Sequence, residues 1–168
     1  MSTAAFVTCD LLDDNPEKEI QVVTPSMDGK FFKSYGARKI FGGQVVTVKC
    51  FEDNSRVKEL LATDGTGKVL VVDGGASMRC ALMGDMIAES AVKNHWNGVV
   101  IYGCDVDAIA ELDLGVHALA AIPQKSNRKG IGEVDLTLYF GGVSIHSGDY
   151  IYADNNGIVI AKEKLVDL

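Results

Sequence analysis

Residues 68–102 read KVLVVDGGASMRCALMGDMIAESAVKNHWNGVVIY, and this stretch decides the fold. The apolar run 68–73 predicts a buried strand that ends at a Gly-Gly pair, and 98–102 predicts a second one. Between them, 83–94 has the spacing of an amphipathic helix. Strand, helix and strand over this length are typical of a βαβ unit, so we expect two parallel strands joined by a right-handed crossover.

Working outward, the flanking segments predict further strands and short helices. We expect a strand over 44–51, which follows the Gly42-Gly43 pair, and a two-turn helix that begins at Ser55 with Ser55 or Asn54 as its cap. Thr8 is predicted to cap a short first helix through Leu12. The tail is predicted to form a β meander of four strands, at 133–140, 143–146, 149–153 and 157–161. The chain thus reads as one α/β domain spanning residues 1–168.

Composition and charge narrow the function classes. The chain has 168 residues, of which 47% are hydrophobic and 23% charged, as in ordinary globular domains. Its formal charge of -7 has the wrong sign for binding a phosphate backbone, so direct nucleic-acid binding is not expected. No apolar run approaches the about 20 residues that a membrane helix needs. The first residues do not form a secretory or transit leader, which predicts a cytoplasmic protein.

Glycines and carboxylates follow both strands of the βαβ unit, and ligand sites of such sheets lie beyond the carboxyl ends of the strands. Gly84 to Ile87, at the start of the helix, offers free amides and the positive end of a helix dipole to an anion. Alternatively, Asp85 only complements the dipole. Asp105 and Asp107 follow the second strand and fit either helix caps or metal ligands.

Other chemistry-bearing residues have no motif around them. The histidines His95, His117 and His146 are dispersed, and we interpret them as structural. The four cysteines lack metal spacing and are predicted to be reduced and mostly buried. The basic segment 125–130, KSNRKG, is interpreted as a solvated loop. No glycine fingerprint of a nucleotide or a methyl-donor cofactor is present, so neither cofactor is expected.

Five further stretches carry a resemblance to a known family. They are FGGQVVTVKCFEDN at 41–54, GKVLVVDGG at 67–75, GVVIYG at 98–103, ELDLGVHALAAIP at 111–123 and GDYIYADNNGIVIA at 148–161. Together they resemble the regulator of ribonuclease activity A (RraA-like) family, which is related to the class II aldolases of 4-hydroxy-4-methyl-2-oxoglutarate and 4-carboxy-4-hydroxy-2-oxoadipate. The resemblance implies an α/β/β sandwich of the swivelling phosphohistidine-domain type, assembled as a homotrimer with clefts between subunits.

The same resemblance implies roles for individual residues. The aldolase signature is Gly-Asp, twenty residues, then Arg-Asp, and here Gly84-Asp85 and Val106-Asp107 occupy that frame. The amides of Gly84, Asp85, Met86 and Ile87 would then bind the pyruvyl group of a small 2-oxo acid, with Val106 lining the same site. Asp107 would hold Mg²⁺ or Mn²⁺, and Asp85 would be the catalytic residue that moves the proton. A hard divalent cation suits such carboxylates.

Val106 is the departure from the aldolase pattern, because the aldolases carry an arginine there that clamps the pyruvate carboxylate. Loss of such a charge would cost on the order of 10²–10³ in rate. The sequence therefore favours an RraA-like regulator that binds and inhibits an RNA-processing ribonuclease through protein contacts. The alternative is a metal-dependent lyase, a 4-hydroxy-4-methyl-2-oxoglutarate aldolase or oxaloacetate decarboxylase. Arg38, Arg79 and Arg128 are the candidates to replace the missing clamp.

Overall fold

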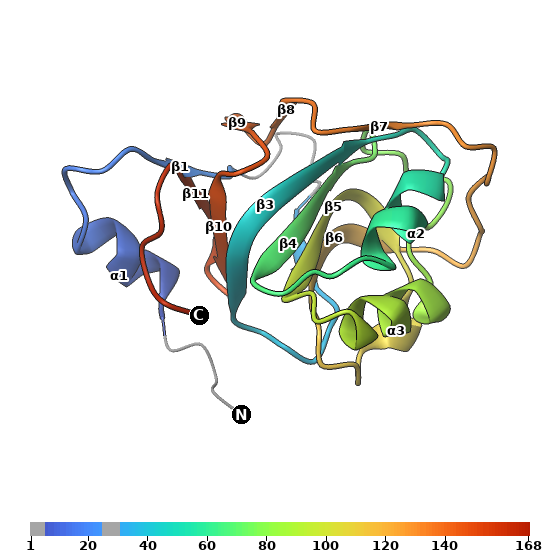
Figure 1. Ribbon diagram of the computed structural model, residues 1–168, viewed down its shortest axis with the longest axis horizontal. Coiled ribbons are helices and arrows are strands. Elements are labelled where there is room, and N and C mark those ends of the chain that lie inside the picture. Colours follow the sequence, from blue (N-terminus) through green and yellow to red (C-terminus); the bar gives the residue numbers. More distant parts are fainter. Residues whose placement is uncertain (1–5, 25–30) are drawn as a thin grey trace.

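The computed structural model describes residues 6–24 and 31–168, and it is a mixed α/β fold with one large mixed sheet and few helices (Figure 1). In chain order the elements are α1 (Thr8–Asp13), β1 (Ile20–Val22), β2 (Lys33–Ser34), β3 (Phe41–Lys49), α2 (Ser55–Leu61), β4 (Lys68–Asp73), α3 (Asp85–Lys93), β5 (Gly98–Asp105), the 3₁₀-helix η1 (Asp107–Ile109), β6 (Gly115–Ala121), β7 (Glu133–Val134), β8 (Leu138–Phe140), β9 (Val143–Ile145), β10 (Tyr150–Asp154) and β11 (Gly157–Ala161).

The large sheet has the order β1-β11-β10-β3-β4-β5-β6-β2, with β7 paired to β3. Its middle strands β3, β4, β5 and β6 run parallel, whereas the strands outside them run antiparallel. The predicted βαβ unit is confirmed as β4-α3-β5, in which Val69 pairs with Gly98 and Asp73 with Tyr102. Below, the carboxyl edge is the side of the sheet where β3 to β6 end, and the amino edge is the side where they begin.

Alternation along the apolar strands builds two cores, one on each face of the sheet. Leu70 and Val72 of β4 face α2 and α3, whose buried side chains complete the helix-side core. Val69 and Val71 point to the opposite face, where they pack with β8, β9, β10 and β11. Figure 1 shows α2 and α3 on one side of the parallel strands and the β10-β11 hairpin, with α1 beyond it, on the other. The continuous apolar run at 68–73 thus reflects a strand covered on both faces.

The predictions for β3 and for the cap of α2 need correction. The strand predicted over 44–51 begins earlier, at Phe41, and contains the Gly42-Gly43 pair. A side chain at either glycine would collide with a neighbouring backbone segment. A Cβ at Gly42, for example, would lie 2.6 Å from the Ile151 carbonyl oxygen. The glycines therefore allow neighbouring segments to approach β3 closely. In α2, Asn54 is the cap residue but makes no side-chain cap bond; the Ser55 amide instead donates to Asp53 at 3.0 Å.

The first helix begins at Thr8 as predicted, but Thr8 does not cap it. Val7 occupies the cap position and no side chain bonds the first turn. The Thr8 amide and hydroxyl instead donate to the two carboxylate oxygens of Asp154 on β10, at 2.7 and 2.8 Å. These bonds, with Phe6 and Leu11 packed against β10 and β11, hold α1 on the hairpin.

The predicted C-terminal meander is wrong in its pairing. The segment predicted as a strand over 133–140 divides into β7 and β8, because Asp135 between them has a φ of 64°. β8 and β9 form a separate hairpin, while β10 inserts between β11 and β3 of the large sheet. The four predicted strands therefore belong to two sheets. No helix of the described ranges, 6–24 and 31–168, is long and apolar enough to cross a membrane.

Candidate functional site

The amino end of α3 opens at the carboxyl edge of the sheet. Gly84 precedes the helix with φ -107° and ψ -176°, a conformation open to any residue, and a Cβ built on it meets no atom within 4 Å. Neither backbone strain nor packing requires glycine here. The exposed Asp85 begins the helix and accepts a 2.9 Å hydrogen bond from the Met86 amide, while Ile87 is buried in the helix-side core. Gly84 thus leaves space beside the first-turn amides.

The second part of the site follows β5. The residues just before Gly84 and those at the end of β5 run side by side, since the Leu82 amide donates to the Cys104 carbonyl oxygen at 2.9 Å. Asp107 is the first residue of η1, which lies against α3, and it is exposed. The two predicted carboxylates, Asp85 and Asp107, therefore stand at the same edge of the sheet, on neighbouring elements.

Val106 lies between Asp105 and Asp107 in the sequence, but its side chain is partly buried against the helix-side core. Its amide donates to Asp105 Oδ1 at 2.7 Å. Position 106 thus contributes neither a positive charge nor a free amide to the edge.

Asp105 is fully buried, and its Oδ2 atom has no hydrogen-bond partner. Burial raises the pKa of this carboxyl to about 8, and the bond from the Val106 amide offsets only part of the rise. Burial also raises the pKa of the Tyr35 phenol, and the neighbouring Cys104, Asp105 and Asp107 raise it further. Tyr35 therefore lies near the same acids. At the sequence level, Asp105 and Asp107 had the same two interpretations, as helix caps or as metal ligands. They could not be separated there, because no local sequence pattern shows that only Asp105 is buried.

The donors at the carboxyl edge fit a hard divalent cation. Among the described residues, no three or more His, Cys, Asp or Glu side chains lie close enough together to hold a metal by themselves. Mg²⁺ and Mn²⁺ do not need such a cluster, since they bind through one or two carboxylates and fill the remaining positions with water and substrate oxygens. Asp107 and Asp85, on neighbouring elements, each offer a carboxylate of that kind, whereas a zinc site would need histidine or cysteine ligands.

The structure separates the three arginines that could replace the missing clamp. Arg38 lies at the amino edge, where its Nε and Nη2 atoms each donate to Asp113 at 3.1 Å. Arg79 lies at the carboxyl edge, but it is bound to Glu52 at 2.6 and 2.7 Å, with its guanidinium over the Phe51 ring. Arg128 is exposed in the loop that follows β6.

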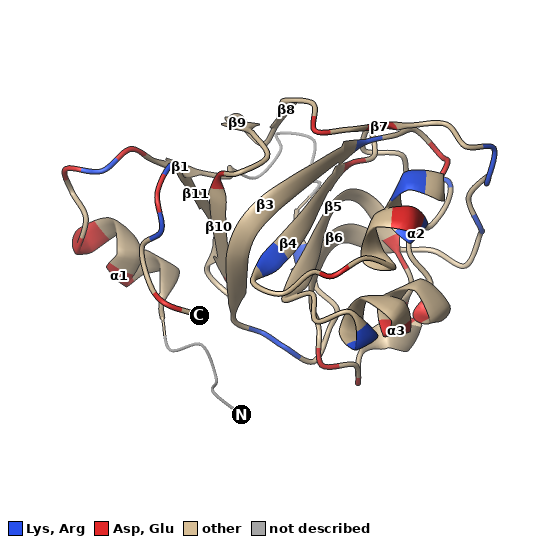
Figure 2. Ribbon diagram, viewed as in Figure 1, with Lys and Arg blue, Asp and Glu red and all other residues tan. Residues whose placement is uncertain are grey.

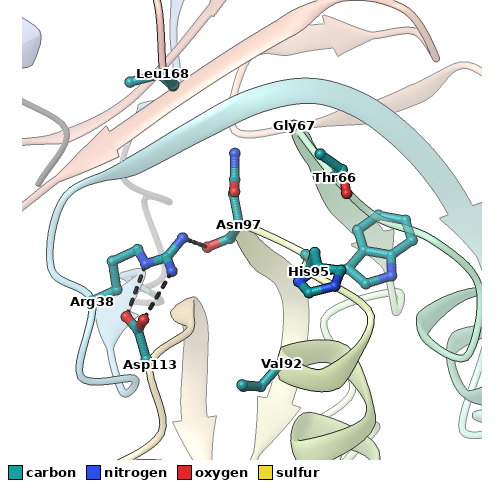
Figure 3. A pocket seen from close by; sticks show the side chains of 9 residues that line it. Arg38, Thr66, Gly67, Val92, His95, Asn97, Asp113 and Leu168 are labelled. Atoms are coloured by element: carbon teal, nitrogen blue, oxygen red, sulfur yellow. Dashed lines mark hydrogen bonds and ion pairs between the residues drawn. The ribbon is translucent and has the colours of Figure 1, made fainter. Parts of the chain in front are cut away.

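A cavity of about 610 Å³ opens at the amino edge, where Arg38, Asp113, His95 and Asn97 surround it (Figure 3). Arg38 also donates to the Asn97 carbonyl oxygen at 3.4 Å, so its charge is already satisfied. Apart from Arg38, none of the residues predicted to form the site lines this cavity. Its lining residues come from segments far apart in the sequence, and no local pattern could have indicated it.

The buried His117 and the free cysteines fit the predictions made for them, whereas His95 and His146 are exposed. His117 is buried on β6 with its ring edge-on to Phe41, and neither ring nitrogen has a hydrogen-bond partner. Desolvation lowers its pKa to about 4. All four cysteines are free thiols; Cys50, Cys80 and Cys104 are buried and Cys9 is exposed.

Comparison with known proteins gives consistent matches over nearly the whole chain. A protein of Acinetobacter baylyi named "Putative 4-hydroxy-4-methyl-2-oxoglutarate aldolase" is 81% identical over 168 residues, covering 99% of each chain. A solved structure described as an S-adenosylmethionine: 2-dimethylmenaquinone methyltransferase of Geobacillus kaustophilus has a TM-score of 0.89 and 41% identity, over 95% of this chain and 97% of that one. A structure described as the RNA-processing inhibitor RraA of Thermus thermophilis has a TM-score of 0.86 and 40% identity, over 98% and 97%.

The family model described as RraA-like, Aldolase/RraA, matches residues 8–160, which include the open end of α3, both exposed acids and every strand of the parallel core. The family resemblance seen in the sequence is therefore confirmed. The chain belongs to the RraA-like family.

Proposed function

We propose that this protein is a divalent-metal-dependent lyase that releases pyruvate from 2-oxo acids such as 4-hydroxy-4-methyl-2-oxoglutarate or oxaloacetate. The observation that carries the proposal is Gly84, a glycine that neither strain nor packing requires, facing open space at the amino end of α3. Asp85 and Asp107 stand at the same edge, where ligands of open α/β sheets bind. The name of the Acinetobacter baylyi relative adds support.

The residues at this edge have complementary roles in the proposed reaction. The Asp85 and Ile87 amides in the first turn of α3, where the Met86 amide already donates to Asp85, bind the carboxylate of the pyruvyl group, which the positive end of the helix dipole favours. Asp85 accepts the proton of the substrate's 4-hydroxyl group, directly or through a water, as the C3–C4 bond breaks. It returns the proton to C3, so that the pyruvate enolate leaves as pyruvate. Asp107 would hold the metal, which supplies a Lewis acid for the negative charge that develops on the 2-oxo oxygen.

Val106 sets a limit on this activity. The side chain packs into the helix-side core, so the carboxylate of the pyruvyl group depends on helix amides and on charges elsewhere at the edge. Oxaloacetate decarboxylation tolerates this better than aldol cleavage, because it needs less exact placement of a large substrate. We therefore expect oxaloacetate to be turned over faster than 4-hydroxy-4-methyl-2-oxoglutarate.

Pyruvate release from both substrates, measured with Mg²⁺ or Mn²⁺ and again with a chelator, tests the proposal. The native protein should release pyruvate above the protein-free background only with metal, and Asp107→Ala should remove that activity. Val106→Arg should raise aldol cleavage if the missing guanidinium limits the rate. Turnover that is unchanged in Asp107→Ala would contradict the assigned metal role.

A second candidate is an RraA-like regulator that inhibits an RNA-processing ribonuclease by direct contact. The likeness to the Thermus thermophilis RNA-processing inhibitor favours it, and the charge of -7 would attract a basic partner. Its test is the rate of RNA cleavage by a purified ribonuclease E with and without the protein. An unchanged rate at saturating protein would remove this candidate.

Under either proposed function, we expect the protein to form the assembly that the family resemblance implies. This assembly is a homotrimer of α/β/β sandwiches of the swivelling phosphohistidine-domain type. Exposed apolar side chains such as Met86, Tyr139 and Ile131, at 79%, 72% and 58% exposure, are available for subunit contacts. Light scattering coupled to size-exclusion chromatography should give three times the chain's mass of 18.0 kDa.

A further inference from the structure

The sequence contains the dipeptide Asn-Gly twice, at 97–98 and at 156–157. An asparagine before glycine deamidates spontaneously when the next backbone nitrogen can reach its side-chain amide carbon, since glycine has no side chain to block the approach. The reaction needs a side chain that can rotate and a following amide that can move. The fold therefore decides which of the two asparagines reacts.

Asn97 is held in place by hydrogen bonds and packing. Its side-chain amide donates to the Gly42 carbonyl oxygen at 2.9 Å, and its backbone amide donates to the Lys68 carbonyl oxygen at 2.9 Å. Gly98 is the buried first residue of β5, and a Cβ built on it would overlap the Phe41 ring. The Gly98 nitrogen can therefore reach the Asn97 side chain only when this part of the sheet opens.

Asn156 has none of this protection among the described residues. It is exposed in the turn between β10 and β11, and its side-chain amide makes only a long bond, 3.5 Å, to Asp154 Oδ2. Gly157 has a φ of 150°, and a Cβ built on it meets no atom within 4 Å. The pair of Asp154 and Gly157 is the last of the hairpin, where strands open most easily. The Gly157 nitrogen is thus the freer of the two attacking groups.

We propose that Asn156 is a spontaneous modification site of this protein, at which deamidation creates a carboxylate beside Asp154, while Asn97 is protected. The Gly157 nitrogen loses its proton and forms a bond to Asn156 Cγ, ammonia leaves, and the product is a cyclic succinimide. Water then opens the ring at either carbonyl, which gives aspartate or isoaspartate. The side chain gains a negative charge, and water is the only reactant that the step consumes.

The new charge acts on the contact that holds α1. Asp154 accepts bonds from the Thr8 amide and hydroxyl, at 2.7 and 2.8 Å, and from the Asn156 amide at 2.8 Å. Burial raises the pKa of Asp154, but these bonds lower it by more, so the carboxyl is ionised at neutral pH. An aspartate oxygen in the place of the Asn156 amide nitrogen would lie 3.5 Å from Asp154 Oδ2. Two carboxylates at that separation repel each other, which weakens the anchor of Thr8.

The region that receives the charge is already acidic. Figure 2 shows red segments on α1, where Asp10 and Asp13 are exposed. A further carboxylate at this end of the molecule adds to the repulsion. We therefore expect deamidation to loosen α1 from the β10-β11 hairpin while the sheet stays folded.

Peptide mass spectrometry of protein aged in mildly alkaline solution tests the modification. The conversion of each asparagine is followed over time, and electron-transfer fragmentation distinguishes isoaspartate from aspartate. In the folded protein we expect Asn156 to convert at least about tenfold faster than Asn97, which reacts only when its surroundings open. In guanidinium chloride, which unfolds the chain, both should convert at similar rates.

Two variants with equal added charge test the effect on α1. Asn156→Asp places the carboxylate beside Asp154, and the matched control Asn155→Asp adds the same charge to the neighbouring exposed residue of the turn. Hydrogen exchange of the α1 amides, measured by mass spectrometry, should be at least about threefold faster in Asn156→Asp, because a like-charge contact opposes the anchor. The control should exchange as the native protein does.

The inference is overturned if Asn156 and Asn97 convert at equal rates in the folded protein, or if Asn156 stays unconverted there while the unfolded chain reacts. Exchange in α1 that is unchanged in Asn156→Asp, or accelerated equally in Asn155→Asp, would contradict the effect on the anchor. Neither measurement depends on pyruvate release, so both outcomes are separate from the proposed function.

Discussion

The two edges of the parallel sheet use the same residue types in opposite ways. At the amino edge glycine is needed for packing, since a Cβ at Gly98 or Gly115 would overlap the Phe41 ring, and the charges of Arg38 and Asp113 satisfy each other. At the carboxyl edge Gly84 faces open space, Asp105 has an oxygen without a partner, and Arg128 forms no ion pair with the described residues.

This difference teaches where to look for chemistry in such a domain. A large hollow is the usual first candidate for a binding site, and here the cavity of about 610 Å³ lies at the amino edge. Arg38, Asp113 and the Asn97 side chain are already hydrogen-bonded there, so a ligand that uses these groups would have to break existing bonds. The carboxyl edge instead offers groups whose bonds are unmade. We therefore place the proposed site by the unsatisfied groups at the strand ends and not by cavity volume.

The largest effect should come from filling the packed edge. Gly115→Ala places a methyl group in the Phe41 ring, and we expect a loss of about 3 kcal/mol in the free energy of unfolding, since overpacking a core is costly. Urea unfolding measures it. The control is Gly84→Ala, for which we expect no loss, because the backbone there suits alanine and the space is open. Equal stability of the two variants would contradict the contrast between the edges.

Acid should weaken the packed interior through His117. Its pKa is about 4 in the folded protein and about 6.5 in an unfolded chain, so the unfolded state takes up the proton first as the pH falls. Stability from this group is present above pH 6.5 and is lost as the pH falls toward 4. The loss should approach about 3 kcal/mol relative to His117→Leu, since one pKa unit corresponds to about 1.4 kcal/mol.

Parallel unfolding curves of native protein and His117→Leu at pH 7 and pH 4 check this. Groups common to both proteins cancel in the difference. A difference that does not change with pH would show that His117 is not held neutral.

A moderate effect is expected when the open edge is narrowed. Gly84→Ala should raise the KM for oxaloacetate about tenfold by placing a methyl group beside the first-turn amides, while the melting temperature stays at the native value. Steady-state kinetics and thermal melting measure the two quantities. An unchanged KM would mean that substrate does not approach α3 at this residue.

The smallest effect belongs to the amino-edge cavity. Arg38→Gln removes a partly exposed ion pair with Asp113 and should cost about 0.5 kcal/mol of stability. Pyruvate release should be the same as in the native protein. Loss of activity in this variant would move the functional site to the opposite edge of the sheet.

The parts of the fold that depend on local pattern were predictable. The apolar runs at β4 and β5 and the helix between them could be read directly. The bonds from Thr8 to Asp154 could not be predicted, because the two residues lie 146 positions apart in the sequence. The strand β6 was missed, since GVHALAA combines small residues with a buried histidine and has no clear alternation. The two-residue β2 is too short for any pattern.

The candidate site also has one part that a sequence pattern indicates and another that depends on the folded structure. The Gly84-Asp85 motif and Asp107 carry a recognisable spacing, so their presence at one edge could be expected. The burial of Asp105 could not be expected from the sequence, because it depends on packing around the end of β5. The segment 125–130 reads as a solvated loop, and its side chains are exposed; its course across the edge depends on backbone bonds to Ala81, Glu52 and Asp53, which no sequence pattern encodes.

The central claim is that catalysis takes place at the carboxyl edge and not in the amino-edge cavity. One measurement compares two aspartates, one at each edge: pyruvate release from oxaloacetate, with Mg²⁺ and corrected for the protein-free rate, by Asp107→Asn and Asp113→Asn. Both aspartates are exposed, so both variants should fold. We predict that Asp107→Asn loses at least about 100-fold in rate, as expected when a group that holds a catalytic metal is removed, while Asp113→Asn retains native activity. Native activity in Asp107→Asn, together with its loss in Asp113→Asn, would contradict the account.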